Sequence, residues 1–340
     1  MLPQFHPTKY WHKLENGRIQ CDLCPQACKL NEGQRGICFV RMRANDQIVL
    51  TTHSRSSGLA IDPIEKKPLN NFLPGSKAYS FGTAGCNLLC KFCQNWDISK
   101  ARETDILNKN ATPENIAAIA KEYGCKSVAF TYNEPIIFME YAIDVAKECH
   151  KLGLKTVAVT NGYICDEPRK EFFSYMDAAT VGLKGFTERF YKDITGSHLQ
   201  PVLETLIYLK KYTNVWFEIV SLLIPDENDS AAEIEKQSTW IKENIGIDVP
   251  VHYTAFHPDW KMLDKPSTPL ETLIQARDIT MKNGLRYVYT GNVYHPEGAK
   301  TFCYNCKNCI IARDNYEIAE YHLDDGGNCK FCHTKCDGVF

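Results

Sequence analysis

The sequence predicts an α/β fold in which a parallel β-sheet is covered by helices and flanked by a cysteine-rich segment at each end of the chain. Short apolar runs alternate with helical patterns over residues 76–295, as is typical of a parallel sheet. About six or seven such units favour a barrel, complete or partial, over a two-layer fold. The alternation of apolar runs and helical patterns stops on both sides of this region. We therefore expect an N-terminal cysteine-rich segment over 1–75 and a C-terminal module over 296–340.

The strands are expected in apolar runs that are bounded by turn-forming residues. In chain order these runs are KAYSFGT from residue 77, SVAFTY from 127, KTVAVTNG from 155, AATVGLKG from 178, NVWFEIVSLLIP from 214, PVHYTAFHP from 250 and LRYVYTG from 285. A plausible helix follows each run except the last.

The clearest helix signal lies at residues 113–123. Thr112 can cap this helix, Pro113 suits its first position and Gly124 ends it. Residues 268–269 repeat the Thr-Pro pair and predict another helix start. The buried face of the first helix is expected to consist of Ile116, Ile119, Ala120 and Tyr123.

Polar residues and one cysteine follow the ends of successive strands. Because functional groups in parallel α/β folds collect where the strands end, we expect these residues to face one mouth. They are Cys86, the segment Tyr132-Asn133-Glu134-Pro135, the segment Thr160-Asn161-Gly162, Lys184, and Phe256-His257-Pro258.

The sixteen cysteines are clustered, and the N-terminus lacks the layout of a secretory signal. Clustered thiols in such a chain indicate metal ligands rather than disulfides. The central cluster has three members, Cys86, Cys90 and Cys93, although a closed tetrahedral site or a fully ligated iron–sulfur cluster needs four thiolates. Three cysteines stand alone and are interpreted as small buried apolar residues: Cys125, Cys149 and Cys165.

The spacing C-x3-C-x2-C, with Phe92 before the third cysteine, resembles the signature of the radical SAM superfamily. In that family three thiolates hold a 4Fe–4S cluster, and the fourth iron binds the amino and carboxylate groups of S-adenosylmethionine. Reductive cleavage of this cofactor then gives a 5′-deoxyadenosyl radical. The resemblance implies a complete or partial (β/α) barrel and accounts for the missing fourth cysteine. The alternative from the residues alone is a zinc knuckle that borrows a ligand from elsewhere.

The resemblance extends to the other strand ends. Glu134, with Asn133 before it, matches the strand-two element that receives the cofactor amino group, although the family's glycines are replaced here. Lys184 resembles a lysine near the cofactor carboxylate, but Gly182 stands where activating enzymes carry an acid. The alternatives without a cofactor are that Glu134 only caps a helix and that Lys184 is an ordinary solvated side chain.

Further cofactor-binding positions follow from the same resemblance. Phe92 would lie near the adenine, and His257 would approach the ribose, with a structural histidine as its alternative. The strand-three element beside the cofactor is matched by Thr160, Asn161 and Gly162.

The outer cysteine sets predict two additional metal sites. The N-terminal set suits either a structural tetrahedral site or an auxiliary 4Fe–4S cluster, and zinc and iron–sulfur both stay open. It consists of Cys21, Cys24, Cys28 and Cys38. The C-terminal set resembles a zinc ribbon or rubredoxin-like module, with a structural or an electron-relay role. It consists of Cys303, Cys306, Cys329 and Cys332, with Cys309 and Cys336 interpreted as spectators or else as ligands of a larger cluster.

Several longer stretches resemble one subgroup, the AmmeMemoRadiSam system radical SAM enzymes. They include CDLCPQACKLNEGQRGICFVR, LKGFTERFYKDITG and TGNVYHPEGAKTFCYNC. The subgroup implies a pathway association with a Memo-like protein and an Ammecr-type protein. The family as a whole implies an electron donor of the flavodoxin or ferredoxin type.

These observations predict a radical SAM enzyme that abstracts hydrogen from an unknown small-molecule or peptide substrate. CQNWDIS resembles the activating enzymes of glycyl-radical proteins, so activation of a partner protein is the alternative within this class. The outer metal modules favour hydrogen abstraction from a small-molecule or peptide substrate over activation of a partner protein. A multi-site electron-transfer protein is the alternative of another class, but it leaves Glu134, Lys184 and His257 unexplained.

Composition sets the remaining expectations. A formal charge of −2 predicts no broad basic surface and therefore no nucleic-acid partner. No run approaches the roughly 18 apolar residues that span a bilayer, so we expect a soluble, cytoplasmic protein.

Overall fold

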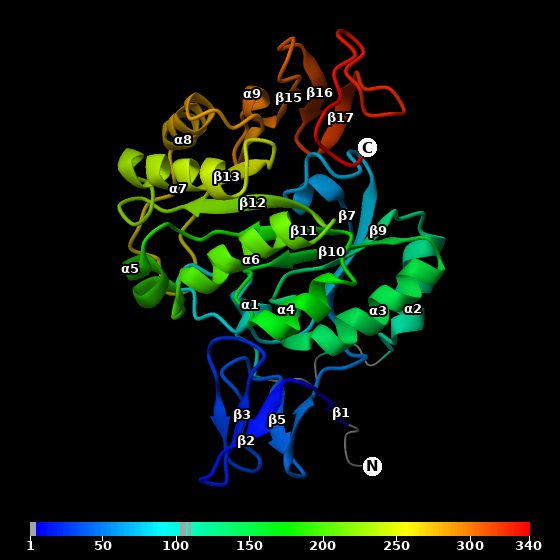
Figure 1. Cartoon of the computed structure of the whole chain (residues 1–340), viewed down its shortest axis with the longest axis vertical. Helices are drawn as coiled ribbons and strands as arrows, with labels where there is room; N and C mark the ends of the chain where they lie inside the picture. The colour runs from blue at the N-terminus through cyan, green and yellow to red at the C-terminus, as the bar shows by residue number, and fades with distance from the viewer. Residues whose placement is uncertain (1–4, 103–106, 108–109) are drawn as a thin grey trace.

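The structure is a computed structural model that describes residues 5–102, 107 and 110–340. Residues 1–4 of the predicted N-terminal segment, and residues 103–106 and 108–109 of the predicted barrel, lie outside the described part. The chain forms a central α/β body with a small N-terminal module at one end and a C-terminal module at the other (Figure 1).

The central sheet has eight strands in the order β14-β13-β12-β11-β10-β9-β8-β7. Strands β8 to β14 are parallel, and β7 is antiparallel to β8. Their bounds are Ser57–Pro63 for β7, Lys77–Gly82 for β8, Ser127–Phe130 for β9, Lys155–Thr160 for β10, Ala178–Gly182 for β11, Trp216–Leu223 for β12, Val251–Ala255 for β13 and Val288–Gly291 for β14. Within the described residues β7 and β14 do not pair, so the sheet is an open, partial barrel. The predicted α/β class with parallel strands is confirmed.

Helices follow the strands and cover the outer face of the sheet (Figure 1). The α-helices are α1 (Trp96–Ser99), α2 (Pro113–Glu122), α3 (Met139–Lys151), α4 (Asp166–Phe173), α5 (Glu188–Phe190), α6 (Gln200–Tyr212), α7 (Ala231–Asn244), α8 (Leu270–Lys282) and α9 (Pro296–Ala299). Shorter helical turns are η1 (Ile64–Lys66), η2 (Pro135–Phe138) and η3 (Tyr191–Thr195). Strands β9, β11 and β13 are buried along their whole length, as expected for parallel strands enclosed on both faces.

Two local predictions about helices were wrong. Tyr123 is 58% exposed because α2 ends at Glu122, which leaves Tyr123 at the C-cap with its ring in solvent. Thr268 does not cap α8: its hydroxyl accepts from the Phe256 N–H and donates to the Leu223 carbonyl, and Pro269 takes the cap position. The cap at Thr112 is confirmed, since its hydroxyl accepts from the Asn115 N–H.

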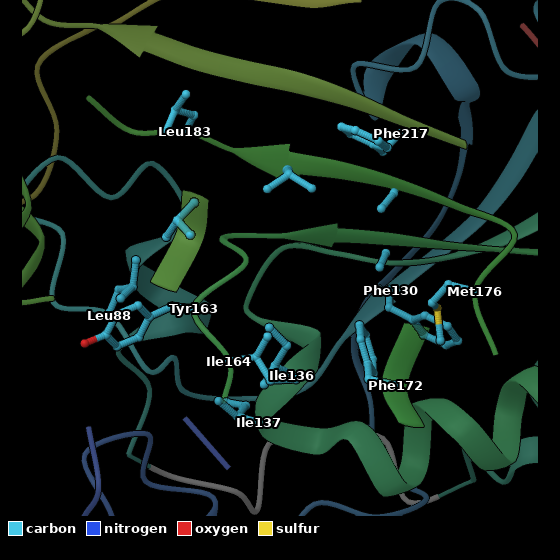
Figure 2. Packing of buried hydrophobic residues seen from close by; sticks show 14 of the residues in the cluster. Leu88, Phe130, Ile136, Ile137, Tyr163, Ile164, Phe172, Met176, Leu183 and Phe217 are labelled. Carbon is cyan, nitrogen blue, oxygen red and sulfur yellow. The ribbon is translucent and has the colours of Figure 1, made fainter. Parts of the chain in front are cut away.

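A continuous core joins the sheet to the helices (Figure 2). Phe130, Phe172 and Leu183 are fully buried between these layers, and each such side chain contributes about 1.5–3 kcal/mol on burial. The same core cluster includes cysteines of the N-terminal and central sets. The sites are therefore built on the rigid part of the molecule.

The N-terminal module contains two small antiparallel sheets, β1-β6-β5 and β2-β3-β4. Its strands are His6–Pro7 (β1), Trp11–Lys13 (β2), Ile19–Cys21 (β3), Lys29–Leu30 (β4), Arg41–Ala44 (β5) and Gln47–Leu50 (β6). The C-terminal module contains one sheet of β15 (Thr301–Phe302), β16 (Cys309–Asp314) and β17 (Glu317–Tyr321).

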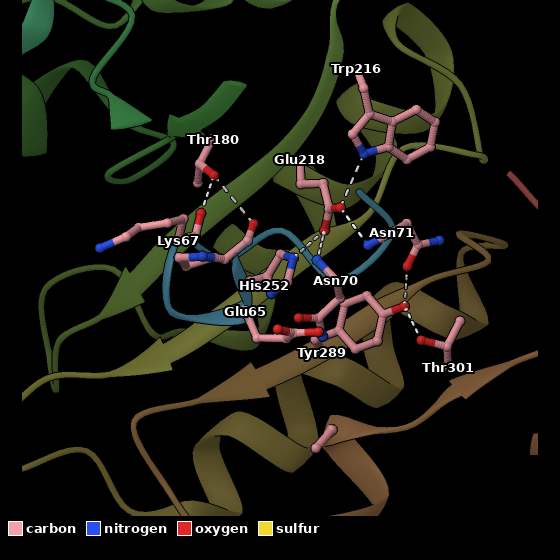
Figure 3. A network of polar contacts seen from close by, with 12 residues as sticks. Glu65, Lys67, Asn70, Asn71, Thr180, Trp216, Glu218, His252, Tyr289 and Thr301 are labelled. Atoms are coloured by element: carbon pink, nitrogen blue, oxygen red, sulfur yellow. Dashed lines mark hydrogen bonds and ion pairs between the residues drawn. The ribbon is translucent and has the colours of Figure 1, made fainter. Parts of the chain in front are cut away.

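Residues 64–73 form a strap that crosses the barrel near the amino-terminal ends of its strands (Figure 3). The fully buried Glu218 carboxylate accepts from the backbone N–H groups of Asn70 and Asn71, and His252 Nε2 lies 2.6 Å away. A buried carboxylate is tolerated only when it is satisfied in this way. The strap therefore closes the end of the barrel opposite the predicted mouth.

Candidate active site

A cavity of about 300 Å³ opens at the carboxyl-terminal ends of the strands. Residues from the strap, from the loop after β8 and from the ends of β9 to β14 line it. The predicted site residues among them are Cys86, Cys90, Phe92, Cys93, Asn133, Glu134, Thr160, Asn161 and Lys184. The structure thus brings together side chains that are up to about a hundred residues apart in the sequence.

The three central cysteines lie on the loop between β8 and α1. The loop is fastened to η3, since the Leu89 N–H donates to the Thr195 carbonyl at 2.8 Å and the Lys91 N–H to the Ile194 carbonyl at 3.0 Å. Burial raises the pKa of Cys86 to about 12, so a metal held by this thiol would have to displace its proton.

The spacing of these sulfurs argues against a single metal ion. In the described part of the chain, only one cysteine set brings three or more sulfurs within 4.8 Å of one another, and the central set is not that one. Thiolates that bind different irons of a cluster must be further apart than the ligands of one ion. No other cysteine lines the cavity among the described residues, so a 4Fe–4S cluster held here would have one iron open to the cavity.

Glu134 is the most constrained acid in the cavity. Its carboxylate accepts from the Thr160 hydroxyl at 2.6 Å and from the Asn161 N–H at 2.7 Å, and it also caps η2 through the Ile136 N–H. Burial raises its pKa from 4.5 to about 7, although these donors and Lys184 oppose the shift. Glu134 therefore caps η2, and in the same position its pKa responds to the charges around the cavity.

Lys184 is half-buried just beyond β11. Its N–H donates to the Tyr191 hydroxyl at 3.1 Å, and its carbonyl accepts from Asn228 Nδ2 at 2.7 Å. After burial, which raises the pKa of Cys90, the ammonium of Lys184 is the largest opposing influence on that thiol. Lys184 therefore acts electrostatically on both the thiolate loop and Glu134.

An amide network holds the thiolate loop against the neighbouring strands. Asn133 Nδ2 donates to the Gly85 carbonyl at 2.9 Å, and its Oδ1 accepts from the Thr83 N–H at 3.0 Å. Asn161 Nδ2 donates to Asn87 Oδ1 at 2.8 Å. Sequence reasoning missed Asn87, whose only signal was its place directly after the first cysteine.

Sequence reasoning also missed Lys100, which lines the cavity. Its ammonium donates to the Leu88 carbonyl at 2.7 Å and lowers the pKa of Cys86 against the effect of burial. A lysine after a short helix carries no recognisable signal in a single sequence.

Two predicted positions lie outside the cavity lining. Gly162 adopts a φ of 68° in the turn after β10, and its N–H donates to the Thr160 hydroxyl at 3.0 Å. His257 is exposed, with Nδ1 3.5 Å from the carbonyl oxygen of Pro258. Gly162 shapes the turn that presents Asn161, whereas the geometry gives His257 no contact with the cavity.

The C-terminal set forms a compact four-sulfur group. Cys303 Sγ and Cys332 Sγ are 3.6 Å apart, and Cys306 Sγ and Cys329 Sγ are 3.7 Å apart. A tetrahedral ion with metal–sulfur bonds of about 2.3 Å needs sulfurs about 3.8 Å apart. The set therefore fits one zinc or iron ion, while Cys309 and Cys336 lie outside the group.

The fold and the cysteine loop define the class of the protein as a partial (β/α) barrel with three cysteines at its mouth. Residues 81–236 match the family model of the radical SAM superfamily. The chain is 37% identical to the uncharacterised protein MJ0808 of Methanocaldococcus jannaschii, over 97% of this chain and 98% of that protein. The chain belongs to the radical SAM superfamily, and this membership implies an enzyme.

More distant relatives agree with this assignment. The pyruvate formate-lyase-activating enzyme of Clostridium pasteurianum is 25% identical over 56% of this chain and 84% of that enzyme. The crystal structure of Streptococcus suis SuiB bound to S-adenosylmethionine matches with a TM-score of 0.51 at 17% identity, covering 68% of this chain and 53% of SuiB. The latter similarity shows a shared fold.

Among the described residues, no helix is long and apolar enough to cross a membrane.

Proposed function

We propose that the protein reductively cleaves S-adenosylmethionine and uses the resulting radical to abstract hydrogen from a small-molecule or peptide substrate. The observation that carries this proposal is the buried Glu134 carboxylate, which lines the same cavity as the three central cysteines. Among the described residues the sulfurs of these cysteines do not form a group within 4.8 Å. A 4Fe–4S cluster on Cys86, Cys90 and Cys93, together with the cofactor, would supply the 5′-deoxyadenosyl radical.

The residues of the cavity have distinct proposed roles in holding the cofactor. Glu134 would accept an N–H of its amino group, and Lys184 would pair with its carboxylate. Phe92 and the segment Thr160–Gly162 would enclose the adenosine part, with Asn133 and Asn161 fixing the walls. His257 stays a prediction that would require the segment after β13 to move inward.

The remaining finer assignments are also proposals. We propose membership of the AmmeMemoRadiSam subgroup, with Memo-like and Ammecr-type pathway partners and a flavodoxin- or ferredoxin-type electron donor. The compact sulfur geometry supports one zinc or iron ion at the C-terminal set. The N-terminal set is proposed to bind a metal centre of its own.

A second candidate function is the activation of a glycyl-radical enzyme. The similarity to the Clostridium pasteurianum activating enzyme favours it, but that match covers only 56% of this chain. The similarity therefore leaves much of the chain without a counterpart. A glycyl-radical electron paramagnetic resonance (EPR) doublet on a protein incubated with this enzyme would favour activation, whereas its absence with substrate turnover would favour the first proposal.

The test is 5′-deoxyadenosine formation by anaerobically reconstituted protein with S-adenosylmethionine and sodium dithionite. We expect formation by the wild type, its loss in Cys90→Ala, and its retention in Cys149→Ala, because Cys149 is buried outside the cavity. No 5′-deoxyadenosine from wild-type protein with a full complement of iron would overturn the proposal and favour an electron-transfer protein.

A further inference from the structure

The N-terminal cysteine set lies directly against the thiolate loop of the cavity. A β-carbon built on Gly85, the residue before Cys86, would lie 2.0 Å from the Cys38 carbonyl oxygen, so the two backbones are in contact. With standard backbone dimensions this places the α-carbons of Cys38 and Cys86 within about 10 Å of each other. Gly85 can take its φ of 81° and this close approach because it has no side chain.

Hydrogen bonds fix the same interface. Gln26 Nε2 donates to the Asn87 carbonyl at 3.0 Å and to the Gly196 carbonyl at 2.9 Å. The Cys165 N–H donates to the Leu23 carbonyl at 3.1 Å. The loop that carries the N-terminal cysteines is thus attached to the loops after β8 and β10.

The geometry of the N-terminal set differs from that of the C-terminal set. Among the described residues the sulfurs of Cys21, Cys24, Cys28 and Cys38 do not form a group within 4.8 Å, although those of the C-terminal set do. Cys21, Cys24 and Cys38 are buried and Cys28 is half-buried. A wide, buried set of four thiolates fits a four-iron cluster better than a single ion.

The surroundings provide positive charge for such a cluster. Arg41 is 1% exposed, and its Nη1 has no hydrogen-bond partner among the described residues. The Arg41 guanidinium forms an ion pair with the Glu140 carboxylate, and its Nε donates to the Ile137 carbonyl at 2.9 Å. Arg35 lies beside Cys38, since its Nη1 donates to the carbonyl of the next residue, Phe39, at 2.8 Å. Buried cations stabilise an anionic cluster and ease its reduction.

We propose that the N-terminal set binds a 4Fe–4S cluster that passes electrons to the radical cluster. One electron would leave a low-potential reductant of the flavodoxin or ferredoxin class, reduce the N-terminal cluster from the 2+ to the 1+ state, and move on to the radical cluster, which is reduced likewise. The N-terminal cluster returns to 2+, and no proton is transferred. Cys28 marks the outer, more accessible side of this path and Cys38 the inner side. The relay rests on the proposed function, whereas the cluster assignment does not.

The first test uses wild-type protein purified anaerobically. We expect about eight irons and about one zinc or mononuclear iron per chain. After full reduction the two cluster spins should show dipolar splitting in the EPR spectrum, because the sites are adjacent. About four irons with two zincs, or two clusters without splitting, would overturn the proposal.

The second test separates the delivery of electrons through the N-terminal cluster from the cleavage of S-adenosylmethionine at the radical cluster. Cys28→Ala should lose about four irons, and the ratio of flavodoxin-driven to dithionite-driven 5′-deoxyadenosine formation should fall at least tenfold. Cys165→Ala, a half-buried cysteine beside the same module, should keep the iron content and the ratio of the wild type. An unchanged ratio in Cys28→Ala would overturn the relay.

Failure of the proposed function would look different. In that case the wild type would keep eight irons and coupled spins, but S-adenosylmethionine would not change the Mössbauer signal of any iron. The N-terminal assignment would then stand without the radical chemistry.

Discussion

If Glu134 binds S-adenosylmethionine as proposed, its pKa should make the affinity for this cofactor depend on pH. Burial raises this pKa from 4.5 to about 7 in the free protein, and the proposed acceptance of an N–H from the cofactor amino group requires the ionised carboxylate. About 9% of the carboxylate is ionised at pH 6 and about 76% at pH 7.5, a difference of about eightfold. The α-amino group of the cofactor, with a pKa of about 7.8 when free, must lose its proton to bind iron, so it also favours binding at the higher pH, and about eightfold is the part due to Glu134.

The direction of the pH effect on Kd follows from the form of Glu134 that binds the cofactor, which is the ionised carboxylate. As pH falls through 7, Glu134 takes up a proton and binding weakens, so Kd is expected to be at least about eightfold higher at pH 6 than at pH 7.5. Anaerobic equilibrium dialysis of the holoenzyme without reductant measures this, because the cofactor then binds without being cleaved. Lys184→Met should move the transition to higher pH, since Lys184 holds the pKa of Glu134 down.

Two variants separate Glu134 from other acids. Glu134→Gln should bind weakly at both pH values and lose the part of the affinity increase between pH 6 and 7.5, about eightfold, that is due to Glu134. Glu233→Gln is the control, because burial raises the pKa of Glu233 as well. The Glu233 carboxylate accepts from the Phe186 N–H and does not line the cavity. A flat Kd in the wild type, or the same pH dependence in Glu134→Gln, would refute the reasoning.

Three further predictions concern the framework of the site. Gly85→Ala should lower the free energy of unfolding by more than about 2 kcal/mol in urea titrations, from the left-handed backbone and the contact with the Cys38 carbonyl. Gly124→Ala, with a φ of 68° and open space around it, should cost about 1 kcal/mol and is the control. Cys306→Ser should lose the proposed single C-terminal ion and lower the Tm while the irons of the proposed clusters stay, as metal analysis and thermal scans would show. Glu218→Gln should cost about 1–3 kcal/mol in urea, since an amide places a donor against the strap N–H groups, and a Kd for S-adenosylmethionine changed more than twofold would contradict a purely structural role.

Much of the barrel was predictable because its signals are local. Each parallel strand is an apolar run that ends in a turn, and the ends of parallel strands share one edge of the sheet. That rule was enough to place Glu134, Asn161 and Lys184 around one cavity with the three cysteines. The cap at Thr112 was equally local.

The rest depends on contacts between distant residues. Thr268 has the sequence of a cap, but the Phe256 N–H and the Leu223 carbonyl use its hydroxyl instead. The strap had no periodic pattern, and its place follows from Glu218, about 150 residues further on. Cysteine spacing likewise says which thiols share a loop, but not how far apart their sulfurs lie.

The two outer modules attach to opposite ends of the barrel, and this separates their effects. The N-terminal module contacts the loops at the mouth, through Cys38 and Gly85. The C-terminal module contacts the strap instead, since Arg313 Nη2 donates to the Asn70 carbonyl at 2.7 Å and Asn71 Nδ2 donates to the Asp337 carbonyl at 2.8 Å. Because the strap residue Pro68 lines the cavity, the ion proposed at the C-terminal set would act on the site through the strap. Its removal should therefore loosen the cavity floor and weaken substrate binding, without changing how electrons reach the thiolate loop.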